Sequence, residues 1–178
     1  MATLEKFSLW LVPDEPAGLQ ETIRSLSKKL GTPAWNPHIT LLGGITTTRE
    51  TAMEITAKVA AGGTPFQVTL VEVTSQPMYF QAITATPSPS PQLLALHAHA
   101  VATLGDLAWK QGHFRPHLSL VYGDLDQNVK DQLVARLNKP EAGVVGTIVK
   151  IGKVQMWGIR ADVRDWEIIA ECAFPDAN

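Results

Sequence analysis

A short motif occurs twice in the chain, and its two copies lie about half the chain length apart. Residues 37–41 read Pro-His-Ile-Thr-Leu and residues 116–120 read Pro-His-Leu-Ser-Leu. The histidines stand at positions 38 and 117 of a chain of 178 residues. A repeat at this spacing indicates two copies of one supersecondary unit packed about a pseudo-twofold axis. We therefore expect a single domain over residues 1–178, with repeat halves at roughly 1–76 and 77–178.

The order of apolar patterns supports the repeat. β-branched and aromatic runs predict strands, and apolar residues at helical spacing predict helices. In the first half we expect strands at 7–12, 37–42 and 66–74, with helices at 16–30 and 48–61. In the second half we expect strands at 78–85, 116–122, 147–157 and 166–174, with helices at 92–104 and 126–137. Gly43 and Gly44 are expected to end the strand at 37–42, and Ser90 is expected to cap the helix that follows it.

Composition limits the function classes. Hydrophobic residues make up 45% of the chain and charged residues 18%, which is typical of a soluble globular protein. No apolar run approaches the roughly 20 residues that span a bilayer, so no membrane partner is expected. The single cysteine, Cys172, cannot form an intrachain disulfide, and we expect a cytoplasmic protein. The net charge of −2 argues against a stable nucleic-acid complex and favours a small phosphorylated ligand. We expect a monomer.

The repeated motif pairs each histidine with a hydroxyl. Residues i and i+2 of a strand project to the same face, so His38 and Thr40 project together, and so do His117 and Ser119. The intervening aliphatic residues project to the opposite face. Two such halves facing each other bring two imidazoles and two hydroxyls around one cavity.

This set of groups suits the hydrolysis of a cyclic phosphodiester. One neutral histidine can accept a proton from the attacking water, and one protonated histidine can donate a proton to the leaving ribose oxygen. An unperturbed histidine has a pKa of about 6.5, so both forms coexist near neutral pH. The two hydroxyls can donate hydrogen bonds to the non-bridging oxygens. This chemistry needs no metal and no cofactor.

The paired motifs resemble those of the two-histidine (2H) phosphoesterase superfamily. The segments FSLWLVP, NPHITLLGGI, YFQ and RPHLSLVYGDL are most similar to the cyclic phosphodiesterase-like family within it. This resemblance implies a bilobed α+β fold, with antiparallel sheets lining a central cleft and helices outside. It implies hydrolysis of 2',3'-cyclic nucleotides, or of ADP-ribose 1'',2''-cyclic phosphate, to a monoester that carries the 2'-phosphate. His38 and His117 would be the acid and base, and Thr40 and Ser119 would bind phosphate.

Two further residues match the family pattern. Tyr122 matches a tyrosine that helps to hold a phosphate or water. Strict alternation sends Tyr122 to the other face, so it reaches the site only if the strand bends before Gly123. Trp10 matches a first-strand tryptophan that could stack on a base. An ordinary core tryptophan is the alternative.

Several alternatives stay open. The chain could act as a 2',3'-cyclic phosphodiesterase on RNA ends, with 2'-5' ligase-like reversal. It could also be a nucleotide-binding module without turnover. The sequence does not divide the acid and base roles between the two histidines. His97 and His99 are expected to be ordinary residues of a helix, where positions i and i+2 point apart.

Overall fold

The computed structural model describes residues 3–108 and 113–176. In this part of the chain the first half consists of β1 (Glu5–Pro13), α1 (Ala17–Leu30), β2 (Ile39–Thr47), α2 (Arg49–Ala61) and β3 (Phe66–Ser75). The second half consists of β4 (Ile83–Pro87), α3 (Pro91–Leu104), β5 (Leu118–Val121), α4 (Gln127–Leu137) and β6 (Ile148–Gly158), followed by β7 (Glu167–Ala173). Short 3₁₀ turns include η1 (Tyr79–Gln81), before β4, and η4 (Val163–Asp165), between β6 and β7. Both halves have the order strand, helix, strand, helix, strand that the repeat predicts.

The strands form one antiparallel seven-stranded sheet with the order β1-β2-β5-β4-β3-β6-β7. Because β1 also pairs with β6, six strands close into a ring, and β7 is added to β6. The two halves meet in this ring where β2 pairs with β5, through Ile39 and Leu118. That pair directly follows the two histidines in sequence.

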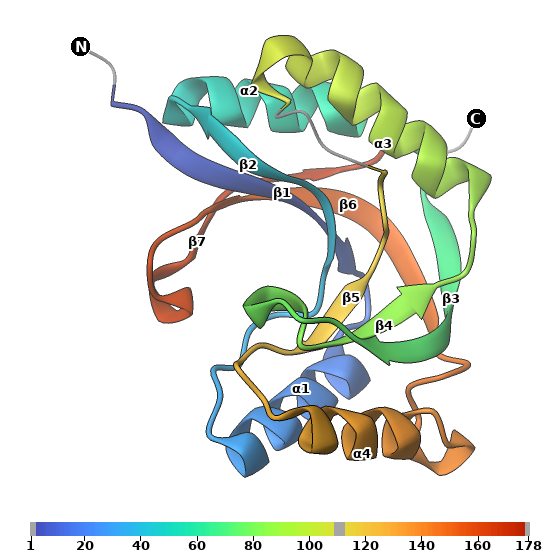
Figure 1. Ribbon diagram of the computed structural model, residues 1–178. Coiled ribbons are helices and arrows are strands. Elements are labelled where there is room, and N and C mark those ends of the chain that lie inside the picture. Colours follow the sequence, from blue (N-terminus) through green and yellow to red (C-terminus); the bar gives the residue numbers. More distant parts are fainter. Residues whose placement is uncertain (1–2, 109–112, 177–178) are drawn as a thin grey trace.

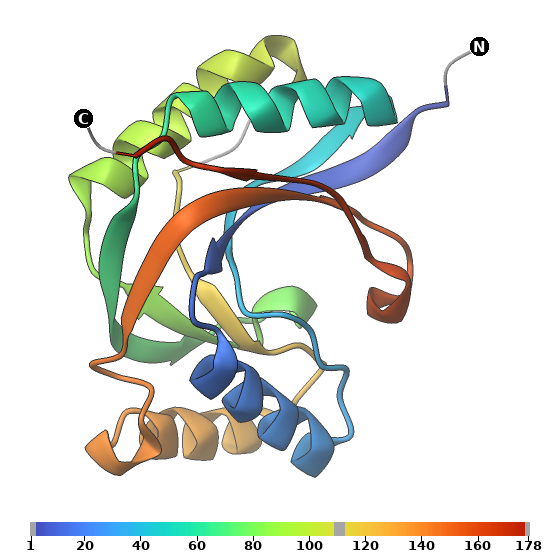
Figure 2. The ribbon, with the colours of Figure 1, turned by 180° about the vertical axis from the view of Figure 1, so that it is seen from behind.

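The helices lie outside the strands in two pairs, as Figures 1 and 2 show from opposite sides. α2 and α3 lie side by side at one end of the sheet, and α1 and α4 lie together at the other end. The α+β fold with outer helices is therefore confirmed. Among the described helices, none is long and apolar enough to cross a membrane.

The strand at 37–42 does not end at its two glycines, as the sequence predicted. β2 continues to Thr47, and its pairing with β1 shifts register between Phe7 and Trp10. Gly44 has a positive φ of 68°, a left-handed conformation that glycine adopts readily and that occurs in bulges. The glycines therefore kink a continuous strand instead of stopping it.

The predicted strand at 78–85 is also wrong in its first half. Residues 79–81 form the turn η1, and β4 begins only at Ile83. The amide of Gln81 donates to the carbonyl oxygen of Met78 (3.0 Å), which closes the turn. The side chains of Met78, Tyr79 and Phe80 have the apolar character of strand residues, but they are exposed at the surface. The predicted cap of α3 is confirmed, since the amide of Leu93 donates to Ser90 Oγ (3.3 Å).

Candidate active site

The two motif histidines have matching local geometry. His38 lies one residue before β2, and His117 lies one residue before β5. Each Nδ1 is 2.8 Å from the backbone carbonyl oxygen two residues earlier, at Asn36 and Arg115 respectively. A carbonyl oxygen can only accept, so each Nδ1 carries a proton, and the Nε2 of a neutral ring keeps a free lone pair. Both imidazoles are therefore held in the tautomer that leaves Nε2 available for proton transfer.

The pairing of Ile39 with Leu118 determines how the two motifs face each other. In an antiparallel pair the numbering runs in opposite directions, so His38 lies across from Ser119, and Thr40 lies across from His117. Each imidazole is thus placed beside the hydroxyl residue of the other half. Side chains alternate along a strand, so all four project from one face, while Ile39 and Leu118 are buried on the other. The structure brings the predicted four residues together.

Tyr122 reaches the same group of residues because the strand ends before it. β5 stops at Val121, and the amide of Gly123 donates to the carbonyl oxygen of Tyr79 (2.9 Å). The Tyr122 hydroxyl is hydrogen-bonded to the Ser119 side chain. Ser119 Oγ also lies 2.9 Å from the carbonyl oxygen of Phe80, to which it donates. The bend that Tyr122 required is therefore present.

Trp10 lies beneath His38 instead of presenting a free face. The rings of His38 and Trp10 are parallel within 4°, with centroids 3.5 Å apart. Trp157 stacks on Trp10 at 4.5 Å and comes from β6, which pairs with the opposite edge of β1 from β2. Trp10 is therefore held between the two rings and is only 2% exposed. A base could stack on Trp10 only if one ring moved away, so in this arrangement Trp10 supports the imidazole.

A family model places the chain among known proteins. The model of the 2'-5' RNA ligase superfamily matches residues 12–158. The chain belongs to the 2'-5' RNA ligase superfamily. Because this group consists of 2H phosphoesterases, the resemblance seen in the paired motifs is confirmed.

Solved structures of other proteins share the fold of this 2'-5' RNA ligase superfamily member. E. coli LigT complexed with 3'-AMP is 16% identical, covers 97% of this chain and 99% of its own, and has a TM-score of 0.66. LigT complexed with NADP+ is 14% identical, with the same coverage and a TM-score of 0.66. The protein TT0787 of Thermus thermophilus is 12% identical, covers 95% of this chain and 97% of its own, and has a TM-score of 0.64. A comparison with curated proteins gives no match.

Burial lowers the pKa of both histidines in this superfamily member. The pKa of His38 falls to about 3, mainly because the ring is buried and also because of charge repulsion from His117. Burial also lowers the pKa of His117. The free protein therefore holds both rings neutral at pH 7, which differs from the mixture that an unperturbed pKa predicts. Burial raises the pKa of Tyr122, so its hydroxyl stays protonated.

The sequence patterns do not predict the aromatic cluster that surrounds Tyr122. Trp35 stacks on Tyr122 with centroids 3.4 Å apart, while Phe80 meets it edge-on at 5.3 Å. Trp166 lies 6.3 Å from Tyr122 and 6.0 Å from Phe80. These three rings come from three different loops, so only the fold brings them together. The one signal in the sequence was the aromatic pair Tyr79-Phe80, which was read as part of a strand.

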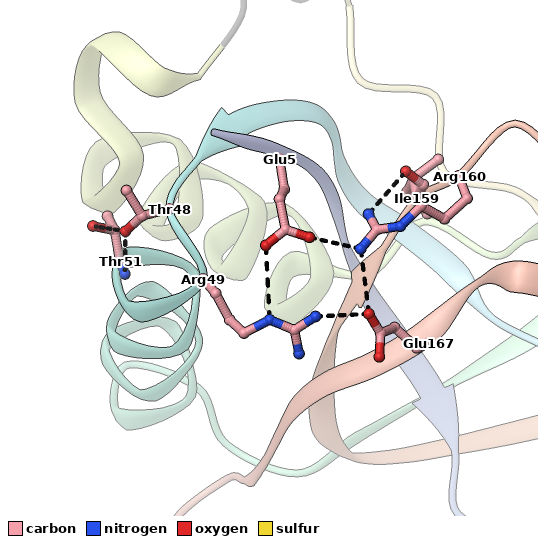
Figure 3. Close-up of polar contacts among 7 residues, drawn as sticks. All are labelled: Glu5, Thr48, Arg49, Thr51, Ile159, Arg160 and Glu167. Carbon is pink, nitrogen blue, oxygen red and sulfur yellow. Dashed lines mark hydrogen bonds and ion pairs between the residues drawn. The ribbon is translucent and has the colours of Figure 1, made fainter. Parts of the chain in front are cut away.

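An ion network fixes the base of the β6–β7 hairpin, which carries Trp166 (Figure 3). Arg160, just after β6, lies 2.6 Å from Glu5 and 3.3 Å from Glu167. Arg49, at the start of α2, lies 2.7 Å from Glu167 and 3.7 Å from Glu5. Isolated surface pairs contribute little, but a network of four charges restrains the elements that it joins. The network therefore ties the hairpin to β1 and α2.

In residues 3–108 and 113–176, no three His, Cys, Asp or Glu side chains gather closely enough to bind an ion together. His99 Nε2 is instead 3.1 Å from the carbonyl oxygen of Lys58, and His97 stacks on Phe114 at 3.9 Å. Both helix histidines thus have packing contacts of their own.

Proposed function

We propose that the chain is a metal-independent hydrolase that opens 2',3'-cyclic nucleotide phosphates to a phosphomonoester, the 2'-phosphate. ADP-ribose 1'',2''-cyclic phosphate is a second substrate that this proposal includes. The observation that carries it is the matched pair of histidines. Both Nδ1 atoms are bound by backbone carbonyls, and both rings share one face with Thr40 and Ser119.

The reaction follows from these groups. The cyclic phosphate lies between the two imidazoles. The hydroxyl of Thr40 donates to one non-bridging oxygen, and the hydroxyl of Ser119 turns from the carbonyl oxygen of Phe80 to donate to the other. One neutral imidazole accepts a proton through Nε2 while the water oxygen bonds to phosphorus. The bond from phosphorus to one ribose oxygen breaks, and the other imidazolium donates its proton to that oxygen. The two hydroxyls stabilise the charge that grows on the phosphoryl oxygens.

Substrate binding supplies the protonated histidine. Both imidazoles are neutral in the free protein at pH 7, because burial lowers the pKa of each. A bound phosphodiester carries a negative charge, which raises the pKa of a nearby imidazole. The proton needed for catalysis is therefore taken up together with the substrate. The free protein is protected from carrying an unpaired buried charge.

The relatives support a ribose phosphate as substrate. LigT has been solved in complex with 3'-AMP and with NADP+. 3'-AMP carries a phosphate on the ribose 3' oxygen, and NADP+ carries one on a ribose 2' oxygen. These are the two oxygens that a 2',3'-cyclic phosphate joins. The family also supports a second candidate, an RNA-end 2',3'-cyclic phosphodiesterase with 2'-5' ligase-like reversal.

The near-neutral charge of the chain favours the small substrate over the RNA end. Comparing turnover of a cyclic mononucleotide with that of an oligonucleotide carrying a cyclic end separates these two functions. A cytoplasmic monomer without a stable nucleic-acid complex is part of the proposal. Size-exclusion chromatography and a binding titration with single-stranded RNA test the last two points.

The deciding experiment is a panel of 2',3'-cyclic nucleotides and ADP-ribose 1'',2''-cyclic phosphate with product analysis, across pH 5 to 9, with and without EDTA. The proposal expects a 2'-phosphate product, unchanged rates in EDTA and a bell-shaped pH profile of kcat, which reports the pKa values of the substrate complex. Loss of activity in EDTA would contradict the metal-independent mechanism. Binding without any turnover would instead support a nucleotide-binding module.

A further inference from the structure

Three consecutive large apolar side chains are exposed beside the candidate site. Met78 is 50% exposed, Tyr79 is 40% exposed and Phe80 is 50% exposed, and they lie on and next to the turn η1. Single exposed apolar residues are ordinary, but adjacent ones beside a polar site often mark a place where a ligand binds. Tyr79 and Phe80, the two of these that belong to the turn, are therefore candidate contacts for the part of the substrate that is not the phosphate.

Both the backbone and the ring of Phe80 contact residues of the candidate site. Its carbonyl oxygen accepts from Ser119 Oγ at 2.9 Å. Its ring is supported by Tyr122 at 5.3 Å and by Trp166 at 6.0 Å. A half-exposed ring that is held from behind can present a fixed face to a ligand.

A hollow of about 730 Å³ adjoins this ring. Three segments line it: Gly31–Pro33, Tyr79–Phe80 and Ala161–Arg164. The first and third segments lead directly into Trp35 and Trp166, which pack with Phe80 around Tyr122. The hollow and the candidate site are therefore joined through one aromatic cluster.

The charges in the hollow cancel each other. Its ionisable lining groups besides Tyr79 are Asp162 and Arg164, which form an ion pair with each other. A phosphate chain is normally bound by unpaired basic side chains, and none lines this hollow. The hollow suits a flat, uncharged group. In a nucleoside cyclic phosphate that group is the base, which is one ribose away from the phosphate.

We propose that the exposed face of Phe80 and the adjoining hollow bind the nucleobase of the substrate. This inference rests on the proposed function, because it assumes that the phosphate lies at His38 and His117. It narrows the proposed function to nucleoside 2',3'-cyclic phosphates and disfavours ADP-ribose 1'',2''-cyclic phosphate, because the ribose that carries its cyclic phosphate has no base. It also assigns base stacking to the accessible ring of Phe80 in place of the buried ring of Trp10, which the sequence suggested. Stacking on an aromatic side chain tolerates every base, so only a weak base preference is expected.

The test compares two substrates that differ only in the base: adenosine 2',3'-cyclic phosphate and 1-O-methylribose 2,3-cyclic phosphate. Wild-type protein is expected to have a kcat/KM about 10- to 100-fold higher for the nucleotide. Phe80→Ala should reduce this ratio about tenfold or more, mainly by raising KM for the nucleotide, and Phe80→Trp should preserve it. Met78→Ala is the matched control, because Met78 is equally exposed on the same turn but does not line the hollow. It should leave the ratio unchanged.

Equal kcat/KM values for the two substrates in the wild type would overturn the inference, as would a Phe80→Ala variant that keeps the wild-type ratio. An equal loss on both substrates would assign Phe80 a purely structural role. If neither substrate is hydrolysed, the proposed function fails, and binding then tests the base site separately. Calorimetric titration with adenosine 2'-monophosphate and with ribose 2-phosphate should show a lower Kd for the nucleotide in the wild type. Phe80→Ala should remove this difference in Kd. If the difference in Kd is the same in Phe80→Ala as in the wild type, Phe80 does not bind the base and the inference is wrong.

Discussion

The imidazole of His38 and the indole of Trp10 are parallel within 4° and 3.5 Å apart, whereas no ring in the described residues stacks on His117. The two halves therefore carry the same reactive groups in different surroundings. Trp10 is fixed in turn, because its Nε1 donates to Ser8 Oγ at 2.8 Å. A rigid ring beneath His38 holds the direction of Nε2, and proton transfer depends on that direction.

Replacing Trp10 tests this support. Trp10→Leu removes the ring beneath His38 and leaves a partly filled space, so we expect a loss of about 2–4 kcal/mol in the free energy of unfolding. The rate should fall about 10- to 100-fold, mainly in kcat, since the imidazole is no longer held. Trp10→Phe keeps a ring and should lose less on both counts. Thermal unfolding and steady-state kinetics measure the two effects. If Trp10→Leu and Trp10→Phe lose kcat equally, the ring is not what positions His38.

The buried histidine makes stability depend on pH. The pKa of His38 is about 3 in the folded protein, and an unfolded histidine has a pKa of about 6.5. Below pH 6.5 the unfolded chain binds a proton that the folded protein does not, so the free energy of unfolding should fall as the pH drops from 6.5 toward 3. Urea unfolding at a series of pH values measures this fall. In His38→Asn the dependence between pH 6.5 and 5 should be weaker, and parallel curves for the two proteins would show that His38 is not the source.

Both motif histidines should be needed for turnover. His38→Ala and His117→Ala are each expected to lower kcat by about 10²–10⁴-fold while the protein stays folded. His113→Ala serves as the control, because His113 is exposed on the loop before the second motif. A substrate such as bis(4-nitrophenyl) phosphate has a leaving group that needs no proton. The variant that recovers activity on this substrate lacks the general acid. The comparison therefore assigns the acid and base roles to the two histidines. Unchanged turnover in both variants would refute the two-histidine mechanism.

The Tyr122 hydroxyl is expected to affect kcat through its hydrogen bond with Ser119. Tyr122→Phe removes the hydroxyl that is hydrogen-bonded to Ser119 but keeps the ring that stacks on Trp35. We expect kcat to fall about 2- to 10-fold, as for the loss of one hydrogen bond, with little change in the melting temperature. Tyr122→Ala also removes the stacking and should lower the melting temperature clearly. A Tyr122→Phe variant that loses stability but keeps its kcat would indicate a structural role alone.

Much of this arrangement could be predicted because it repeats in the sequence. The pattern around His38 and His117 identified the strands, the alternating faces and the four clustered side chains. Features that depend on distant contacts could not be predicted in the same way. The stacking of Trp10 on His38 depends on the register of β1 against β2, and the cluster around Tyr122 depends on three loops meeting. The segment 78–80 has the sequence character of a strand, because exposed apolar residues and buried strand residues are of the same types.

The register that pairs Ile39 with Leu118 also has a stereochemical consequence. It places the two imidazoles at diagonal positions on one face of the β2–β5 pair. In the proposed reaction the phosphorus atom lies between them. Water activated by one ring then approaches opposite the oxygen that the other ring protonates. Such a displacement proceeds in line and inverts the configuration at phosphorus. Hydrolysis of a single diastereomer of a cyclic phosphorothioate in 18O-labelled water should therefore give a chiral phosphorothioate monoester with inverted configuration at phosphorus.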